Sequence, residues 1–91
     1  MISETKSSCL KRLSRIEGQV RGVARMIEAD RYCIDVVTQV SAIRAALAKV
    51  EDVIIKDHVG HCVEHAIMSG DPVQQRAKVI ELVDTLSRMG R

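Results

Sequence analysis

The architecture of this chain follows from residues 33–62, CIDVVTQVSAIRAALAKVEDVIIKDHVGHC. Apolar side chains recur there at alternating steps of four and three, the spacing of a helix that packs lengthwise against another helix. They are Val36, Val40, Ile43, Leu47, Val50 and Ile54. The stretch contains no proline, and Gly60 is its only glycine. We therefore predict one long helix over residues 32–69, with Gly60 as the point where it can kink.

Three potential metal ligands lie at the two ends of this apolar stripe. Cys33 stands one turn before it, whereas His58 and Cys62 continue it at the i, i+4 spacing that puts two side chains side by side. An unbroken helix separates Cys33 from His58 by roughly 37 Å, so one copy cannot gather the three ligands. Two copies packed antiparallel can. We predict a homodimer with two symmetric sites between its subunits.

The ligand types favour a soft metal ion. Two thiolates and one imidazole suit Cu(I), which accepts three ligands, whereas structural Zn(II) usually has four. His65 leans toward the same face, and if it coordinates, a tetrahedral Zn, Ni or Co site becomes reasonable. The alternative is that Cys33 and Cys62 are small core residues and His58 a satisfied histidine at a helix end. Cys9, beside the apolar stripe of the first helix, is expected to be a core residue.

Composition points to a small helical protein. The 91 residues are 46% hydrophobic, lack Phe and Trp, and have Tyr32 as their only aromatic side chain. A chain this short buries little core on its own and tends to oligomerise. We predict an all-α fold in a single domain over residues 1–91.

Two further helices follow from local signals. The first is predicted over residues 4–28, where apolar residues recur at steps of three or four. A break at residues 29–31 should follow, with Asp30 as the N-cap of the next helix. Ser69-Gly70 should end that long helix, and Asp71-Pro72 should cap and begin a third helix to about residue 88.

The chain is expected to be cytoplasmic, without a membrane partner. Its N-terminus lacks the apolar core of a signal peptide, and no apolar run approaches the length of a membrane span. Three cysteines, an odd number, fit no disulfide framework and favour metal or redox chemistry.

The first 25 residues are basic. They contain six cations against Glu4 and Glu17, namely Lys6, Lys11, Arg12, Arg15, Arg21 and Arg25. Such an element indicates a polyanionic partner, the alternative being a solvated helix face. We find no nucleophile–base–orienter set and no Gly-rich phosphate loop, so an enzyme is not expected.

Three motifs resemble one known family: RLSRIEGQVRG at residues 12–22, YCIDVVTQVSA at 32–42 and HVGHC at 58–62. Over residues 6–86 the chain is similar to the copper-sensitive operon repressors and their nickel/cobalt- and formaldehyde-sensing relatives. The resemblance implies a three-helix subunit, an antiparallel four-helix-bundle dimer and a dimer-of-dimers tetramer. It also implies a repressor that binds double-stranded operator DNA in its metal-free form and leaves when Cu(I) binds. Residues 1–91 would then be one metal-sensing, DNA-binding domain.

The resemblance also assigns roles around the metal. Cys33 of one chain would join His58 and Cys62 of its partner. Tyr32 and Glu81 match the outer groups that link the ligand histidine to the rest of the fold. A glutamate that accepts from the other imidazole nitrogen would tie the third helix to metal occupancy. We take this as a hypothesis for switching, in which metal binding shifts the tetramer to a shape that does not bind DNA.

For DNA contact, the resemblance points to Arg12, Arg15 and Gln19 on the first helix and Lys49 on the second. No helix-turn-helix, zinc finger or ribbon pattern is visible. Binding should therefore depend on phosphate contacts and DNA shape, with a steep salt dependence.

Differences between this sequence and the relatives reduce the number of candidate effectors. Ile2 stands where the formaldehyde-sensing branch has proline, and the N-terminal histidine of the nickel/cobalt branch is absent. The persulfide-sensing branch lacks the ligand histidine, so His58 favours copper. A di- or polysulfide bridge between Cys33 and Cys62 across the dimer remains the alternative within the family. A metal-buffering or thiol-redox helical bundle that does not bind DNA is the alternative from another class.

Overall fold

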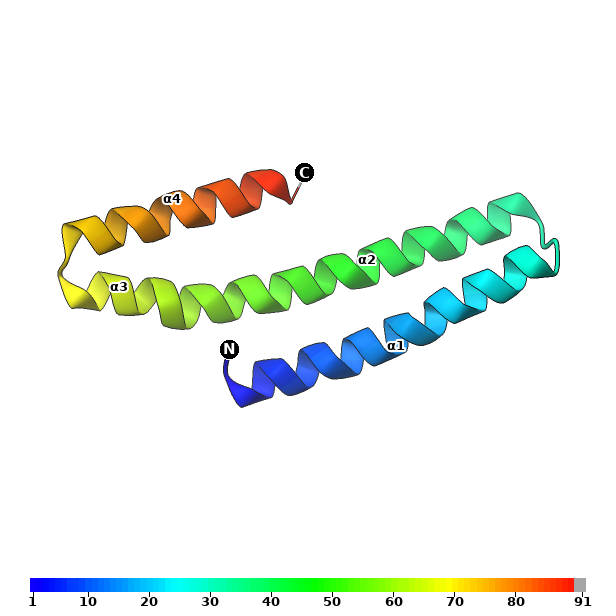
Figure 1. Cartoon of the computed structure of the whole chain (residues 1–91), viewed down its shortest axis with the longest axis horizontal. Helices are drawn as coiled ribbons and strands as arrows, with labels where there is room; N and C mark the ends of the chain where they lie inside the picture. The colour runs from blue at the N-terminus through cyan, green and yellow to red at the C-terminus, as the bar shows by residue number, and fades with distance from the viewer. Residues whose placement is uncertain (90–91) are drawn as a thin grey trace. The chain divides into compact units, whose positions relative to one another are not determined.

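The computed structural model describes residues 1–89, which form helices and contain no strand (Figure 1). The elements are α1 (Ser3–Glu28), α2 (Cys33–His58), the π-helix η1 (Val59–Val63), α3 (Glu64–Ser69) and α4 (Pro72–Arg88). The predicted all-α fold is confirmed. None of the helices in residues 1–89 is long and apolar enough to cross a membrane. The chain forms two compact units, residues 1–55 and the residues from 56 onward, and the single domain stays a prediction.

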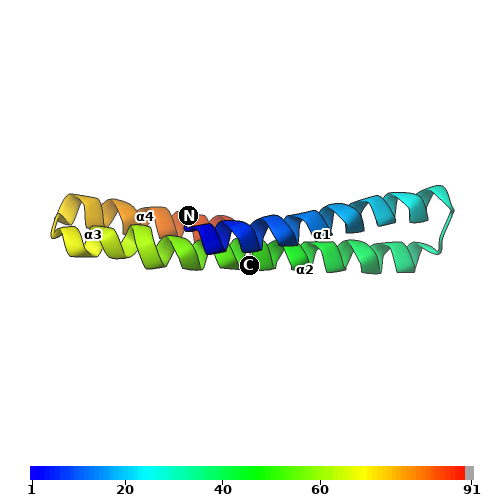
Figure 2. The same cartoon turned by 90° about the horizontal axis from the view of Figure 1, so that it is seen from below.

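The first unit is a hairpin of α1 and most of α2. The two helices run side by side in opposite directions in Figures 1 and 2. Their core is small, with Cys9 and Ile16 of α1 and Val50 of α2 buried, and Ile43, Ala46 and Val53 packed against them. The expectation that Cys9 is a core residue is confirmed, since only 5% of it is exposed.

The turn between α1 and α2 corrects one prediction. Asp30 is not the N-cap of the next helix, because α2 begins three residues later at Cys33. Asp30 instead has a left-handed backbone (φ 54°) just after α1. Its N–H donates to the carbonyl of Ile27, and the N–H of Arg31 donates to that of Met26. These two bonds close α1 with a Schellman motif, in which the carbonyls at the helix end find donors.

Only one edge of the apolar stripe predicted on α2 packs against α1. Ile43 and Val50 lie on the edge that packs against α1. Val40 and Leu47, on the other edge, are each 42% exposed. One copy of the chain therefore covers only part of the stripe, and the rest is open for another helix.

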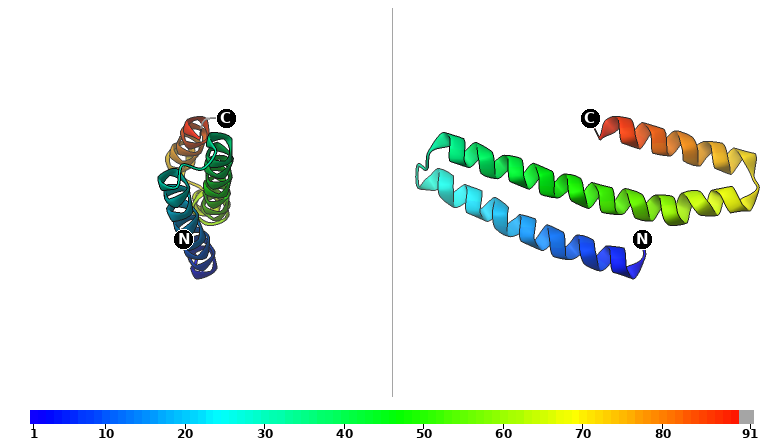
Figure 3. Two further views of the ribbon diagram at one scale, coloured as in Figure 1. Left: turned by 90° about the vertical axis from the view of Figure 1, so that its right-hand side faces the viewer. Right: turned by 180° about the vertical axis from the view of Figure 1, so that it is seen from behind.

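The second unit contains the end of α2, then η1, α3 and α4. The long helix predicted over residues 32–69 is helical throughout from Cys33, but it has a π-helical turn at Val59–Val63. Gly60, the predicted weak point, lies inside this turn. A Cβ at Gly60 would meet nothing within 4 Å, so the glycine is not required by crowding. α4 returns alongside η1 and α3 and contacts both (Figure 3).

The predicted caps around residue 70 are confirmed. Gly70 ends α3 with a left-handed backbone, φ 70°. Asp71 then caps α4, because its Oδ1 accepts a hydrogen bond of 3.0 Å from the N–H of Val73. Pro72 follows as the first residue of α4, the position where its missing N–H costs nothing.

Removing this cap should destabilise α4. We expect Asp71→Ala to lower the free energy of unfolding by about 1 kcal/mol, because an N–H of the first turn loses its acceptor. Urea denaturation followed by circular dichroism measures the loss. Asp71→Asn retains a side-chain acceptor and should lose less. Equal losses in the two variants would show that the side chain acts in some way other than capping.

Candidate metal and DNA sites

The ring of His58 lies against a carboxylate of α4. Its Nε2 lies 2.9 Å from Oε1 of Glu81, which joins the end of α2 to α4 within the second unit. A neutral imidazole that donates from Nε2 leaves the lone pair of Nδ1 for a metal ion. The side chain of His58 is 25% exposed, so the ring is sheltered but reachable. The outer role predicted for Glu81 stays a prediction.

Cys62 lies in the π-helical turn, four residues after His58. Its thiol is free and exposed. Together with His65, Gln74 and Lys78 it lines a shallow hollow between η1, α3 and α4. A thiolate and an imidazole that line one hollow are ligands that a soft cation prefers. His65 shares this hollow, so the conditional Zn, Ni or Co site also stays a prediction.

Cys33 is the first residue of α2, and its thiol is likewise free and exposed. It lines a hollow between the end of α1 and the start of α2 with Asp30, Arg31, Val36 and others. Neither predicted thiolate ligand is a buried core residue in a single copy. The structure therefore does not favour the alternative in which both cysteines are small core side chains.

The three predicted ligands are not a complete site in one copy. Within residues 1–89, no group of three or more His, Cys, Asp or Glu side chains could hold a metal ion. The site shared between two copies stays a prediction.

Two other side chains lie near the predicted ligands in the sequence, and His61 lines the same hollow as Cys62. Tyr32, directly before α2, is 69% exposed, and its predicted outer role stays a prediction. His61 turns toward Asp57, with 3.8 Å between Nε2 and Oδ1, and is more than half exposed. His61 is thus a surface residue, as its position alone suggests.

The predicted DNA-contacting residues of α1 lie on one flank. Arg12, Arg15 and Gln19 are three and four residues apart, so they are neighbours on the helix surface. Arg12 is partly buried, and its Nε donates to Oγ of Ser8 at 3.4 Å. Arg15 and Gln19 are exposed. Lys49 on α2 is exposed too. Such a row of cations and an amide suits phosphate groups.

The carboxylate nearest to this row in sequence points elsewhere. Glu17 accepts from Arg21 at 2.8 Å, and both side chains are more than 60% exposed. Arg21 is nine residues from Arg12, which places it on the far side of α1. Within residues 1–89, Arg12 and Arg15 make no ion pair, so their charge is available to a polyanion.

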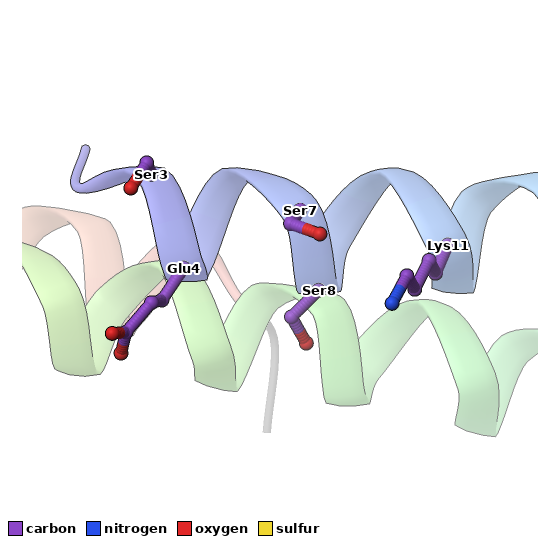
Figure 4. A pocket seen from close by; sticks show the side chains of 5 residues that line it. All are labelled: Ser3, Glu4, Ser7, Ser8 and Lys11. Atoms are coloured by element: carbon purple, nitrogen blue, oxygen red, sulfur yellow. The ribbon is translucent and has the colours of Figure 1, made fainter.

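The N-terminal turns of α1 carry a different surface. Figure 4 shows Ser3, Glu4, Ser7, Ser8 and Lys11 along a shallow hollow there. Three hydroxyl groups and one carboxylate accompany a single ammonium. This mixed lining is less suited to a phosphate backbone than the Arg12 flank is.

The sequence did not reveal two features of the second unit. One is the π-helical turn at Val59–Val63, which carries Cys62. The other is Lys78, whose Nζ lies 3.7 Å from Oε2 of Glu81. Lys78 is one turn before Glu81 on α4, a spacing that indicates an ion pair once Glu81 is singled out.

Comparison with known proteins shows the family of this chain. The profile of a family described as "Metal-sensitive transcriptional repressor" matches residues 5–88. The copper-sensing transcriptional repressor RicR of Mycobacterium tuberculosis is 45% identical over 89 residues, covering 98% of this chain and 92% of its own. The chain belongs to the family of metal-sensitive transcriptional repressors.

Solved structures agree with the fold. The copper-sensing repressor CsoR with Cu(I) from Geobacillus thermodenitrificans is 42% identical and superposes with a TM-score of 0.88, over 100% of this chain and 92% of that one. The nickel-responsive transcriptional regulator InrS is 39% identical, with a TM-score of 0.77 over 87% of this chain and 89% of its own. The three-helix subunit implied by the sequence resemblance is confirmed.

Proposed function

We propose that this protein is a cytoplasmic repressor that binds double-stranded operator DNA when metal-free and releases it on binding Cu(I). The site would lie between two copies, with Cys33 from one and His58 and Cys62 from the other. Subunits would pair as an antiparallel four-helix bundle, and dimers would pair into a tetramer. The observation that carries the proposal is the 2.9 Å contact between Nε2 of His58 and Oε1 of Glu81, with the exposed thiol of Cys62 four residues further along the chain.

The donor set fits copper. Thiolate and imidazole are the ligands that Cu(I) prefers, and three of them suffice. RicR and CsoR, which share 42–45% of their aligned residues with this chain, are copper-sensing repressors. Cys33 of one chain and His58 and Cys62 of the other would hold Cu(I), which would then link the two chains.

The His58–Glu81 bond supplies a route from the site to the fold. A metal ion held at Nδ1 would make the Nε2–H a stronger donor, so a hydrogen bond to Glu81 would tighten. That bond holds the end of α2 to α4. We propose that this tightening biases the assembly toward a form that does not bind DNA.

Glu81→Ala should separate binding from release. We expect Cu(I) affinity to fall by roughly 10- to 100-fold and to stay measurable, since all three ligands remain. Release of DNA should be abolished, because the contact that links α4 to the metal-binding His58 ring is lost. Fluorescence anisotropy of labelled operator, with Cu(I) affinity measured by chelator competition, gives both quantities.

Asp84→Ala is the matched control, because Asp84 is an exposed carboxylate one turn along α4. It should behave like the unaltered protein in both assays. Full copper-driven release by the Glu81→Ala protein would show that the switch runs by another route.

The proposal as a whole is tested by anaerobic Cu(I) titration of the reduced protein on labelled promoter DNA. One Cu(I) per subunit should dissociate the complex. The titration is repeated with a persulfide donor and with Ni(II). DNA that leaves only with Ni(II), or only with persulfide, would reject copper as the effector.

Two observations support rival effectors of the same fold. The exposed, free thiols of Cys33 and Cys62 suit a persulfide-responsive repressor that joins them by a polysulfide bridge. The hollow shared by Cys62 and His65 suits Zn, Ni or Co with a fourth ligand. His65→Ala distinguishes the metals, since it should leave Cu(I) release unchanged and weaken any Ni(II) response.

A further inference from the structure

α2 presents a second apolar face beside the one that packs against α1. Val37 is 59% exposed, Val40 and Leu47 are 42% exposed and Ile54 is 36% exposed. At about 100° per residue, this face lies roughly a third of a turn from the residues that contact α1. We call it the open stripe, defined by Val37, Val40, Arg44, Leu47, Glu51 and Ile54.

Two opposite charges interrupt the open stripe. Arg44 and Glu51 are exposed and seven residues apart, with Leu47 between them. If two copies aligned their stripes in parallel, Arg44 would face Arg44 and Glu51 would face Glu51. In an antiparallel pair with two-fold symmetry, Arg44 of each copy faces Glu51 of the other. Charge therefore favours one direction and opposes the other.

The same alignment brings the predicted ligands together. Arg44 follows Cys33 by eleven residues, and Glu51 precedes Cys62 by eleven. Antiparallel helices advance at equal and opposite rates, so placing Arg44 opposite Glu51 places Cys33 opposite Cys62 to within about one turn. His58 lies within that turn. Two independent features thus specify one alignment.

We propose that reciprocal Arg44–Glu51 ion pairs between two copies fix the alignment of their open stripes at which the shared metal site forms. The antiparallel pairing of the copies and the role of the metal site rest on the function proposed above. Glu51 also makes an interaction within its own chain, and a carboxylate has room for more than one donor. Exposed ion pairs add little affinity, so the pair acts mainly by opposing other alignments.

Charge reversal tests the pair. Arg44→Glu should weaken dimerisation roughly tenfold or more, because two carboxylates then face each other in each half of the interface. Glu51→Arg should weaken it similarly. The double variant R44E/E51R restores opposite charges and should return to within about threefold of the unaltered protein. Sedimentation equilibrium of the full-length, metal-free protein measures the dimer dissociation constant.

Lys56→Glu is the matched control, because Lys56 is an exposed cation of α2 outside the open stripe. It should dimerise like the unaltered protein. Arg44→Glu with unchanged dimerisation, or a double variant no tighter than the single ones, would overturn the proposal. Rescue by the double variant also shows that the single variants had not merely failed to fold.

Cu(I) titration of the same proteins keeps the two proposals separate. The alignment predicts that Cu(I) affinity falls in Arg44→Glu and recovers in the double variant. If dimerisation is lost and rescued while no protein binds Cu(I), the ion pair stands and the metal function is rejected. If Cu(I) binds equally well in all variants while the dimer is unaffected, the ion pair is rejected and the metal function stands.

Discussion

Replacing Cys33 with serine should abolish the release of DNA by Cu(I) while leaving DNA binding intact. A hydroxyl is a poor ligand for a soft ion, so each shared site would retain only His58 and Cys62 of the partner. Structural Zn(II) binds small zinc-finger domains with a free energy of roughly 10 kcal/mol or more, so each ligand accounts for several kcal/mol. Losing one of three ligands should therefore weaken Cu(I) binding by more than about 100-fold.

The measurement is Cu(I) affinity by competition with a chromophoric chelator, together with anisotropy of labelled operator. Cys9→Ser is the control, because Cys9 is buried in the α1–α2 core and away from the predicted ligands. It is expected to change stability and not the copper response. A Cys33→Ser protein that binds Cu(I) as tightly as its parent would remove Cys33 from the site.

A stronger test of the shared site mixes two inactive proteins. Cys33→Ser and His58→Ala subunits each lack a ligand, but a mixed dimer contains one complete site and one that lacks both. Restored Cu(I) binding at up to one ion per mixed dimer would show that the ligands come from two chains. Mixtures that stay inactive after subunit exchange would place all the ligands in one chain.

Replacing both Arg12 and Arg15 with alanine should remove operator binding with the Cu(I) site intact. Removing a single protein–phosphate interaction lowers the slope of log affinity against log salt by about one. The double variant should therefore show a slope smaller by roughly two for each subunit that contacts the operator, and a much weaker affinity at physiological salt. Arg21→Ala is the control, since Arg21 lies on the far side of α1 and pairs with Glu17.

This experiment also separates a regulator from a metal-buffering bundle. A metal-buffering protein would not use Arg12 and Arg15, so the double alanine variant would behave like the unaltered protein in every assay. A regulator loses DNA binding alone. Equal losses in the Arg21→Ala protein would show that the net charge of α1 matters and not this flank.

Local signals in the sequence predicted most of the helices. Asp71 and Gly70 act through contacts with their immediate neighbours, so their residue types were enough to place a cap and a stop. Asp30 was misplaced because aspartate serves both as an N-cap and as a left-handed residue after a helix. Which role it takes depends on how far the chain must travel before α2 begins.

The candidate site could be predicted only in part. The i, i+4 spacing gave His58 and Cys62 as neighbours, but nothing in the local sequence links His58 to Glu81 on α4. That contact came from a family resemblance and is present in the structure at 2.9 Å. The π-helical turn escaped prediction because α- and π-helices share residue preferences and differ in one hydrogen-bond step. Whether Cys33 coordinates the metal depends on how a second chain packs against the first, and local signals in the sequence do not give that packing.

The small core makes the stability of this protein depend on its concentration in the cell. Among residues 1–89, only Cys9, Ile16, Val50 and Ala66 are buried in a single copy. So little covered apolar area cannot offset the entropy of ordering three helices. Where folding depends on association, stability has no value apart from subunit concentration. Dilution then favours the unfolded chain, and a newly made chain folds stably only when it binds another copy.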